Sequence, residues 1–115
     1  MSSRREPLRL QDIVENIDAA RPYVGDMSVD AFKADRKTVD ACERCLQRIT
    51  EAVIKIGEDR MEEIAPTIKA HAIRGLGNTL RHDYDSIDLG YIHSTIVHDL
   101  PPLRAACVAA LKPQP

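Results

Sequence analysis

The side chains best suited to catalysis lie together in one short stretch of this 115-residue sequence. Asn78 and His82 are four residues apart and would share one face of a helix, and Arg81 stands directly beside His82. Tyr84 follows within the same turn. A neutral imidazole can remove a proton from a ribose 2′-hydroxyl while a guanidinium stabilises charge on the phosphate, and this chemistry requires no metal. Spacing alone favours a simpler interpretation, in which Arg and His near a helix C-terminus interact with the helix macrodipole.

The cysteines form the second pattern that could carry chemistry. Cys42 and Cys45 make a Cys-x-x-Cys pair, and Cys107 brings the count to an odd number, which favours a reducing compartment over a disulfide framework. A zinc site would need a second close pair of ligands, and a thioredoxin-like site would need a preceding strand. Neither is evident in the sequence. We therefore predict that the cysteines pack in the core, and we predict no metal site and no cofactor.

The remaining histidines and aromatic residues are isolated from one another. Three histidines lack the spacing of metal ligands, and we expect each in solvent or at an interface: His71, His93 and His98. The aromatic residues form no platform on which bases could stack, and we expect them in the core or at an interface: Tyr23, Phe32 and Tyr91.

Composition narrows the class of protein. Hydrophobic residues make up 43% and charged residues 30% of the chain, which is enough for one core beneath a solvated surface. Aromatic content is only 3%, which argues against a β-sandwich or barrel. The net charge of −2 argues against a general electrostatic nucleic-acid binder, although a local basic groove can exist in a neutral chain. The sequence shows no apolar run long enough for a membrane span and no signal peptide, so we expect a cytoplasmic protein without a membrane partner.

Apolar spacing predicts helices in the N-terminal half. The first is expected over Pro7–Val24, and a short second helix follows a Ser28 cap and ends near Ala34. An Asp35 cap and Gly57 bound the most regular stretch of the chain. Its apolar residues stand three and four apart: Val39, Cys42, Leu46, Ile49, Val53 and Ile56. Such a seam packs against other helices along its whole length.

The C-terminal half is predicted to be helical as well. The charged stretch Glu58–Glu63 is expected to be a solvated loop, within a connection that holds at most a short helix. A fourth helix is predicted over Ile68–Tyr84, and Asp88 is expected to cap a fifth. Asp99 can cap a continuation past a proline pair, either as a kinked extension or as a new helix. We predict an all-α fold, an antiparallel bundle of four to five main helices in one domain over residues 1–115.

The candidate catalytic stretch also resembles a family signature. Four residues match the pattern Arg-Asn-x-Leu-x-His-x-Tyr: Asn78, Leu80, His82 and Tyr84. In the family, the motif is followed by an acidic stretch and then by a helix that begins near an Asp. Asp88 matches that Asp in this sequence. Two further stretches are similar to the same family, Arg48–Ala52 in the central helix and Asp99–Leu103 in the last one. In this order and spacing, the sequence resembles the HEPN superfamily, and within it the HepT-like group.

The resemblance implies an activity and partners. Members of the superfamily are all-α bundles that dimerise and place the His motif of both subunits in one cleft, and many are metal-independent endoribonucleases. HepT-like proteins typically act as toxins and are encoded with a minimal nucleotidyltransferase antitoxin, which attaches AMP to the motif tyrosine. The resemblance thus implies that His82 is the catalytic base and Tyr84 the modified residue, with Asn78 and Asp83 in supporting positions. The implied partners are a second copy of the chain, the nucleotidyltransferase and an RNA substrate.

One position departs from the family pattern, because Gly77 stands where the family has its arginine. Arg81 lies four residues later on nearly the same face, and helical side chains tilt toward the N-terminus. We therefore expect Arg81 to fill the space that Gly77 leaves and to replace the missing arginine, with Arg74 helping at the RNA backbone. The alternatives are a catalytically inactive helical module that binds RNA, a nucleotide or the nucleotidyltransferase, and a purely structural helical dimer.

Overall fold

The computed structural model describes residues 5–68 and 88–113, and within these two ranges helices are the only regular secondary structure. Their order along the chain is α1 (Glu6–Val24), α2 (Val29–Ala34), α3 (Arg36–Ile56), α4 (Glu58–Ile64), α6 (Leu89–Ser94), the π-helical turn η2 (Thr95–Asp99) and α7 (Leu100–Leu111). The predicted all-α class is confirmed. The helix predicted over Ile68–Tyr84 lies, apart from its first residue, outside the described ranges.

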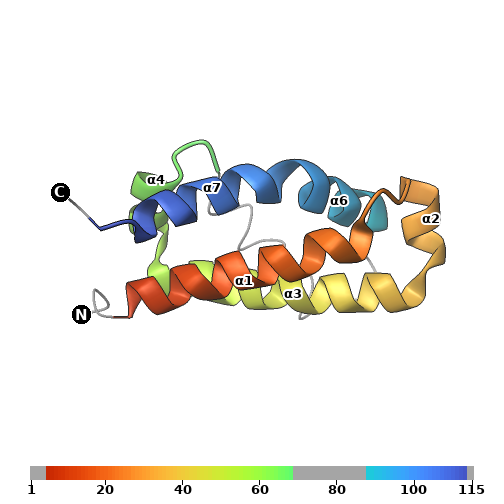
Figure 1. Cartoon of the computed structure of the whole chain (residues 1–115), viewed down its shortest axis with the longest axis horizontal. Helices are drawn as coiled ribbons and strands as arrows, with labels where there is room; N and C mark the ends of the chain where they lie inside the picture. The colour runs from red at the N-terminus through yellow and green to blue at the C-terminus, as the bar shows by residue number, and fades with distance from the viewer. Residues whose placement is uncertain (1–4, 69–87, 114–115) are drawn as a thin grey trace.

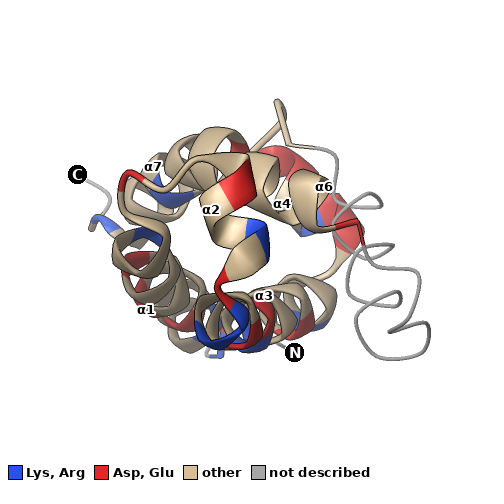
Figure 2. Cartoon of the chain, turned by 90° about the vertical axis from the view of Figure 1, so that its right-hand side faces the viewer, with Lys and Arg blue, Asp and Glu red and all other residues tan. Residues whose placement is uncertain are grey.

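In residues 5–68 and 88–113, three long rods make the body of the bundle. α1 lies antiparallel to α3 on one side and to the continuous α6–η2–α7 rod on the other, and it contacts both (Figure 1). The short α2 closes one end of the bundle, where it contacts α3 and α6. α4 lies at the other end, against the end of α3 and against α7. Viewed from the α2 end, the rods surround a common interior (Figure 2).

The helix boundaries in the first half follow local sequence signals. α1 keeps its predicted end at Val24, with Gly25 beyond it at a φ of 54°. The Ser28 hydroxyl accepts a hydrogen bond from the Ala31 N–H at 3.1 Å, which confirms the predicted cap of α2. The Asp35 carboxylate likewise accepts from the Thr38 N–H at 3.1 Å and caps α3.

The stretch expected to be a solvated loop, Glu58–Glu63, is helical instead and forms most of α4. Its first turn carries Glu58 and Asp59, whose negative charges interact favourably with the N-terminal end of the helix dipole. Met61, only 1% exposed, attaches the helix to the core. The expectation of at most a short helix in this connection is correct, but the burial of Met61 makes it part of the fold.

The proline pair extends the last rod rather than starting a separate helix. Pro101 and Pro102 lie in the first turn of α7, where missing N–H groups cost least. The preceding turn widens into η2, and the Leu100 N–H donates to the Thr95 carbonyl five residues earlier. The Thr95 hydroxyl donates to the Tyr91 carbonyl at 2.8 Å. Of the two predicted outcomes, the extension is the correct one, and the predicted cap is wrong, because the Asp99 side chain makes no capping hydrogen bond where the helix simply continues.

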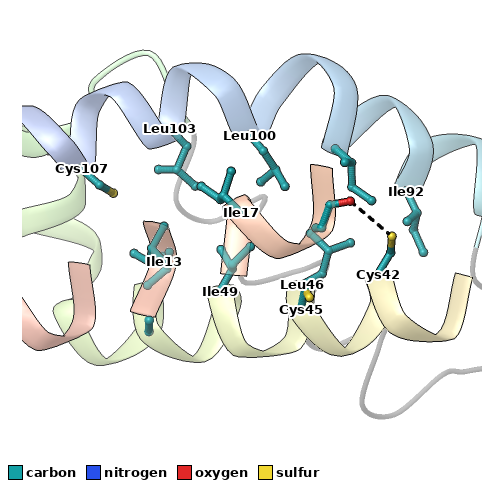
Figure 3. Close-up of a cluster of buried hydrophobic side chains, with 14 of the residues drawn as sticks. Ile13, Ile17, Cys42, Cys45, Leu46, Ile49, Ile92, Leu100, Leu103 and Cys107 are labelled. Atoms are coloured by element: carbon teal, nitrogen blue, oxygen red, sulfur yellow. Dashed lines mark hydrogen bonds between the residues drawn. The ribbon is translucent and has the colours of Figure 1, made fainter. Parts of the chain in front are cut away.

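One hydrophobic core joins the rods. Figure 3 shows Ile13 and Ile17 of α1, Leu46 and Ile49 of α3, and Leu103 of α7 pointing into a shared layer. Each of these side chains is at most 1% exposed. Burial of one such side chain contributes about 1.5–3 kcal/mol, and every residue of the α3 seam that the spacing predicts is buried in this core.

The aromatic residues do not all share this core. Phe32 is completely buried, as expected, whereas Tyr23 is 47% and Tyr91 49% exposed. A place in the core of the subunit is therefore wrong for both tyrosines, and a place at an interface stays a prediction. Among the described helices, none combines the length and hydrophobicity needed to cross a bilayer.

Candidate active site

The residues predicted to carry out catalysis, to support the motif or to be modified lie between the two described ranges. All six are in the segment 69–87, outside the part of the chain that the structure describes: Arg74, Asn78, Arg81, His82, Asp83 and Tyr84. Gly77 and His71 lie there as well. What the structure does describe is how the chain enters and leaves this segment.

On the entry side, the chain is attached through the end of α4. Ala65 is buried, and its N–H donates to the Met61 carbonyl at 2.8 Å. Ile68 donates its N–H to the Ala65 carbonyl at 2.9 Å, and its half-buried side chain packs against the core. The last residue before the segment is therefore held by both backbone and side-chain contacts.

On the exit side, Asp88 starts α6. Its carboxylate accepts hydrogen bonds from the Gly90 N–H at 2.9 Å and the Tyr91 N–H at 3.3 Å, which confirms the predicted cap. Because Asp88 is six residues after His82 in the sequence, this cap is the nearest described anchor of the candidate catalytic residues.

His93 fixes α6 to the rest of the bundle. Its Nε2 lies 2.9 Å from the Met27 carbonyl oxygen, and its ring packs against Phe32 with centroids 5.5 Å apart. The expectation that His93 lies in solvent is wrong, because the ring is half-buried within the subunit, and a place at an interface stays a prediction. The signal was present in the sequence, since His93 is four residues after Leu89 and therefore on the face of α6 that packs inward.

The two anchors belong to opposite ends of the bundle. α4 follows the C-terminal end of α3, whereas α6 contacts α2 near the N-terminal end of α3 (Figure 1). The segment 69–87 thus connects the two ends of the molecule, and both of its attachments depend on contacts with the common core.

The cysteines are packed as predicted. Cys42, Cys45 and Cys107 are free and buried, and the Cys42 thiol faces the Ala20 carbonyl oxygen at 3.9 Å (Figure 3). Desolvation by burial raises the pKa of Cys42 to about 12 and that of Cys107 to about 11. Burial also raises the pKa of Cys45. Thiols with such pKa values are not nucleophiles at neutral pH, so their role is packing.

The cavity between α1 and η2 holds no acid–base pair. It has a volume of about 390 Å³ and is lined by Asp18, Arg21 and apolar residues. Arg104 donates to both Asp18 oxygens, at 2.6 and 3.2 Å, and this hydrogen bonding lowers the pKa of Asp18. The carboxylate is therefore ionised, and no histidine is among the lining residues. In residues 5–68 and 88–113, no cluster of His, Cys, Asp or Glu is arranged to hold a metal ion.

Comparison with known proteins gives the family. The model of the ribonuclease HepT-like family matches residues 13–110, a range that spans most of the chain and includes every candidate catalytic residue. The chain belongs to this family. The resemblance drawn from the motif and its flanking stretches is thereby confirmed.

Curated relatives of this HepT-like chain agree. A Methanocaldococcus jannaschii protein named as a candidate RNase is 32% identical over 92 residues, which cover 80% of this chain and 75% of the relative. A Thermococcus cleftensis protein named as a candidate ribonuclease HepT is 28% identical over 95 residues, 83% of this chain and 86% of the relative. A further M. jannaschii candidate RNase is 30% identical over 95 residues, covering 83% and 78%. No solved structure matches the chain significantly.

Proposed function

We propose that this HepT-like chain is a metal-independent endoribonuclease and the toxin of a toxin–antitoxin pair. The observation that carries the proposal is the family match over residues 13–110, within which the sequence retains Asn78, Leu80, His82 and Tyr84 of the signature. Relatives named as ribonucleases support the same class of activity. The acidic net charge of −2 fits an enzyme with a local RNA site better than a general RNA-coating protein.

The proposed reaction uses the 2′-hydroxyl of the RNA as its nucleophile. His82 removes the 2′-hydroxyl proton, the 2′-oxygen attacks the adjacent phosphorus, and the bond from phosphorus to the 5′-oxygen breaks. The resulting imidazolium returns the proton to the leaving 5′-oxygen. The products are a 2′,3′-cyclic phosphate and a free 5′-hydroxyl, so atoms and charge balance without a metal or a cofactor.

The arginines have separate roles in this proposal. Arg81 stabilises the charge that develops on the phosphate, in place of the arginine that Gly77 replaces. Arg74 contacts the RNA backbone, and Asn78 and Asp83 support the motif. Arg81→Ala should therefore lower kcat by roughly 10²–10³, whereas Arg74→Ala should mainly raise KM. Equal cleavage by Arg81→Ala and the parent would refute the role given to Arg81.

The decisive test is cleavage of a labelled structured RNA in EDTA by purified protein whose mass shows that it carries no AMP. His82→Ala should abolish cleavage, and His98→Ala is the matched control because His98 is an exposed histidine on η2. Cleavage that survives His82→Ala, or that requires a divalent ion, would contradict the proposal. Mapping a cyclic phosphate at the new 3′-end would identify the nucleophile.

Regulation would involve a homodimer and a minimal nucleotidyltransferase. On co-expression with such an enzyme, Tyr84 should gain the mass of one AMP and cleavage should stop. Tyr84→Phe should remain unmodified and active, and Tyr91→Phe is the control because Tyr91 is an exposed tyrosine on α6. Modification of Tyr91, or of neither tyrosine, would contradict this part. Light scattering would measure the oligomeric state.

The second candidate function is a catalytically inactive module that binds RNA, a nucleotide or the nucleotidyltransferase. Gly77 favours it, because Gly77 removes the arginine that the family pattern places there. AMP-free protein that binds RNA but does not cut it would support this candidate.

A further inference from the structure

The outer face of α3 carries four positive side chains along one line, with one exposed carboxylate, Glu51, beside them between Arg48 and Lys55. Lys37, Arg44, Arg48 and Lys55 are seven, four and seven residues apart, so all four lie along one side of the helix. All four are exposed. They stand on the side opposite the buried seam of α3, and Lys37 and Lys55 are about 27 Å apart along the axis at 1.5 Å per residue. We call these four residues the outer stripe.

The stripe concentrates positive charge on an acidic protein. α3 holds five of the 16 Lys and Arg residues but only three of the 18 Asp and Glu residues. The chain as a whole has a net charge of −2, so everything outside α3 carries −4. Seen from the α2 end, the near turn of α3 is blue on the outside of the bundle (Figure 2).

The charges of the stripe are not neutralised within the described parts of the chain. Four arginines elsewhere there are paired with carboxylates, Arg9 with Asp12, Arg36 with Asp40, Arg60 with Glu6 and Glu63, and Arg104 with Asp18, whereas Arg5 and Arg21 have no ion pair within the described residues. No ion pair involves a residue of the outer stripe, in residues 5–68 or 88–113. Arg44 donates to the neutral Gln47 Oε1 at 3.2 Å and keeps its full charge. The flanking Asp40 is occupied by Arg36, at 3.7 Å.

An unpaired line of cations on a solvated helix face suits a linear polyanion. About 27 Å corresponds to about eight stacked nucleotides of one strand at ~3.4 Å each. The stripe contains no aromatic residue, so it can contact phosphates but cannot stack bases. Centres of protein interfaces are depleted in Lys and enriched in aromatic residues, Met and Arg, so the two arginines of the stripe would suit a protein partner but its two lysines and the lack of any aromatic residue favour the polyanion. Among the described residues of α3, Ile54 is the one large hydrophobic residue that is exposed, and it lies about 100° around the helix from the stripe.

We propose that the outer stripe of α3 binds the phosphate backbone of the RNA substrate, without base preference. None of the residues assigned to cleavage belongs to this stripe. This proposal rests on the proposed ribonuclease function. It extends that function by giving the protein a second contact with the RNA strand, which holds substrate equally in the ground state and the transition state. Loss of the stripe should therefore raise KM and leave kcat unchanged.

The binding experiment uses the full chain with His82→Ala, so that RNA stays intact, and a fluorescein-labelled oligouridylate of about eight to ten nucleotides. Anisotropy titrations over a range of salt concentrations compare this parent with Arg44→Gln/Arg48→Gln. Removing two phosphate contacts should flatten the log–log salt slope by about 1.4 and weaken binding roughly 25-fold at 0.1 M salt. Arg44→Lys/Arg48→Lys keeps the charges and should bind like the parent.

The matched control is Arg5→Gln/Arg21→Gln, which makes the same change of net charge on two arginines of the α1 region that have no ion pair within the described residues. Its binding should be nearly unchanged. Equal loss in both double variants would show that net charge alone matters and would overturn the stripe. A changed oligomeric state of Arg44→Gln/Arg48→Gln in light scattering would also overturn it, since the stripe would then be a protein interface.

Failure of the two proposals can be told apart. If the protein with His82 intact binds the oligouridylate but cuts no RNA, the ribonuclease proposal fails and the stripe is still judged by binding. If it cuts RNA while Arg44→Gln/Arg48→Gln binds and cuts like the parent, only the stripe proposal fails. If it binds no oligouridylate at all, the stripe proposal fails whatever the cleavage assay gives.

Discussion

Replacing His93 with alanine tests how α6, the first described element after the candidate catalytic segment, is fixed to the bundle. The substitution removes the hydrogen bond between Nε2 and the Met27 carbonyl, 2.9 Å long and part-buried, and the tilted ring contact with Phe32 at 5.5 Å. Such a hydrogen bond contributes about 1 kcal/mol and such a ring contact about 0.5–1.5 kcal/mol. We therefore expect the free energy of unfolding to fall by about 2 kcal/mol.

The expected shift of the melting temperature follows from chain length. With an unfolding entropy of about 2.1 cal/mol/K per residue, 1 kcal/mol corresponds to about 4 °C for a domain of this size. His93→Ala should thus lower Tm by roughly 8 °C in thermal unfolding followed by circular dichroism. His98→Ala, at an exposed position five residues later, should change Tm by very little.

Two further substitutions separate the contributions. His93→Gln can still donate to the Met27 carbonyl but loses the ring contact, whereas His93→Phe keeps a ring against Phe32 and loses the donor. Each should be about 1 kcal/mol less stable than the parent. A Tm of His93→Ala within about 1 °C of that of His98→Ala would refute the argument that His93 ties α6 to α2, because even one such hydrogen bond corresponds to a larger shift.

Three other outcomes are expected. The pKa of Cys42 is raised from 9.0 to about 12, so the folded state favours the neutral thiol. The free energy of unfolding should therefore be unaffected by this group below pH 9 and should fall as the pH rises toward 12. In urea titrations, Cys42→Ala should reduce that fall. The pKa of Asp18 is lowered by its hydrogen bonds from Arg104, so its contribution to stability is present above its ordinary pKa of 3.8 and lost as pH falls through the lower folded value. Asp18→Asn should remove this acid dependence, and an unchanged profile between pH 4 and pH 2 would contradict it. Asp88→Ala removes the cap of α6 and should cost about 1 kcal/mol, seen as a Tm about 4 °C lower, whereas no shift would mean that the cap is not needed.

The candidate catalytic residues were found from sequence alone, and their family from the order and spacing of short motifs. Spacing by itself favoured an ordinary helix C-terminus around Arg81 and His82, and the resemblance changed that interpretation. The family match confirms the class of protein. The geometry of the segment lies outside the described residues, so the roles of His82, Arg81 and Tyr84 stay predictions that rest on the motif.

Short-range sequence signals predicted where several helices begin and which face of α3 is buried. Ser28, Asp35 and Asp88 each cap the helix predicted for them, because capping joins groups only two or three residues apart. The α3 seam was equally visible, since a spacing of three and four residues places every apolar side chain on one face.

Tertiary contacts decided the rest. Met61 is buried in a helix that packs against both α3 and the distant α7, and this burial makes the apparent loop part of the fold. His93 bonds to a carbonyl 66 residues away, which no local pattern encodes, while Tyr91 is left largely exposed two positions earlier. The choice between an extension and a new helix at Pro101 was likewise settled by the wider turn at η2. The sequence by itself determined the helices with capping signals and the family signature. The helix α4 and the side chains that meet across the bundle depended on how the helices pack, because those contacts join residues that are far apart along the chain.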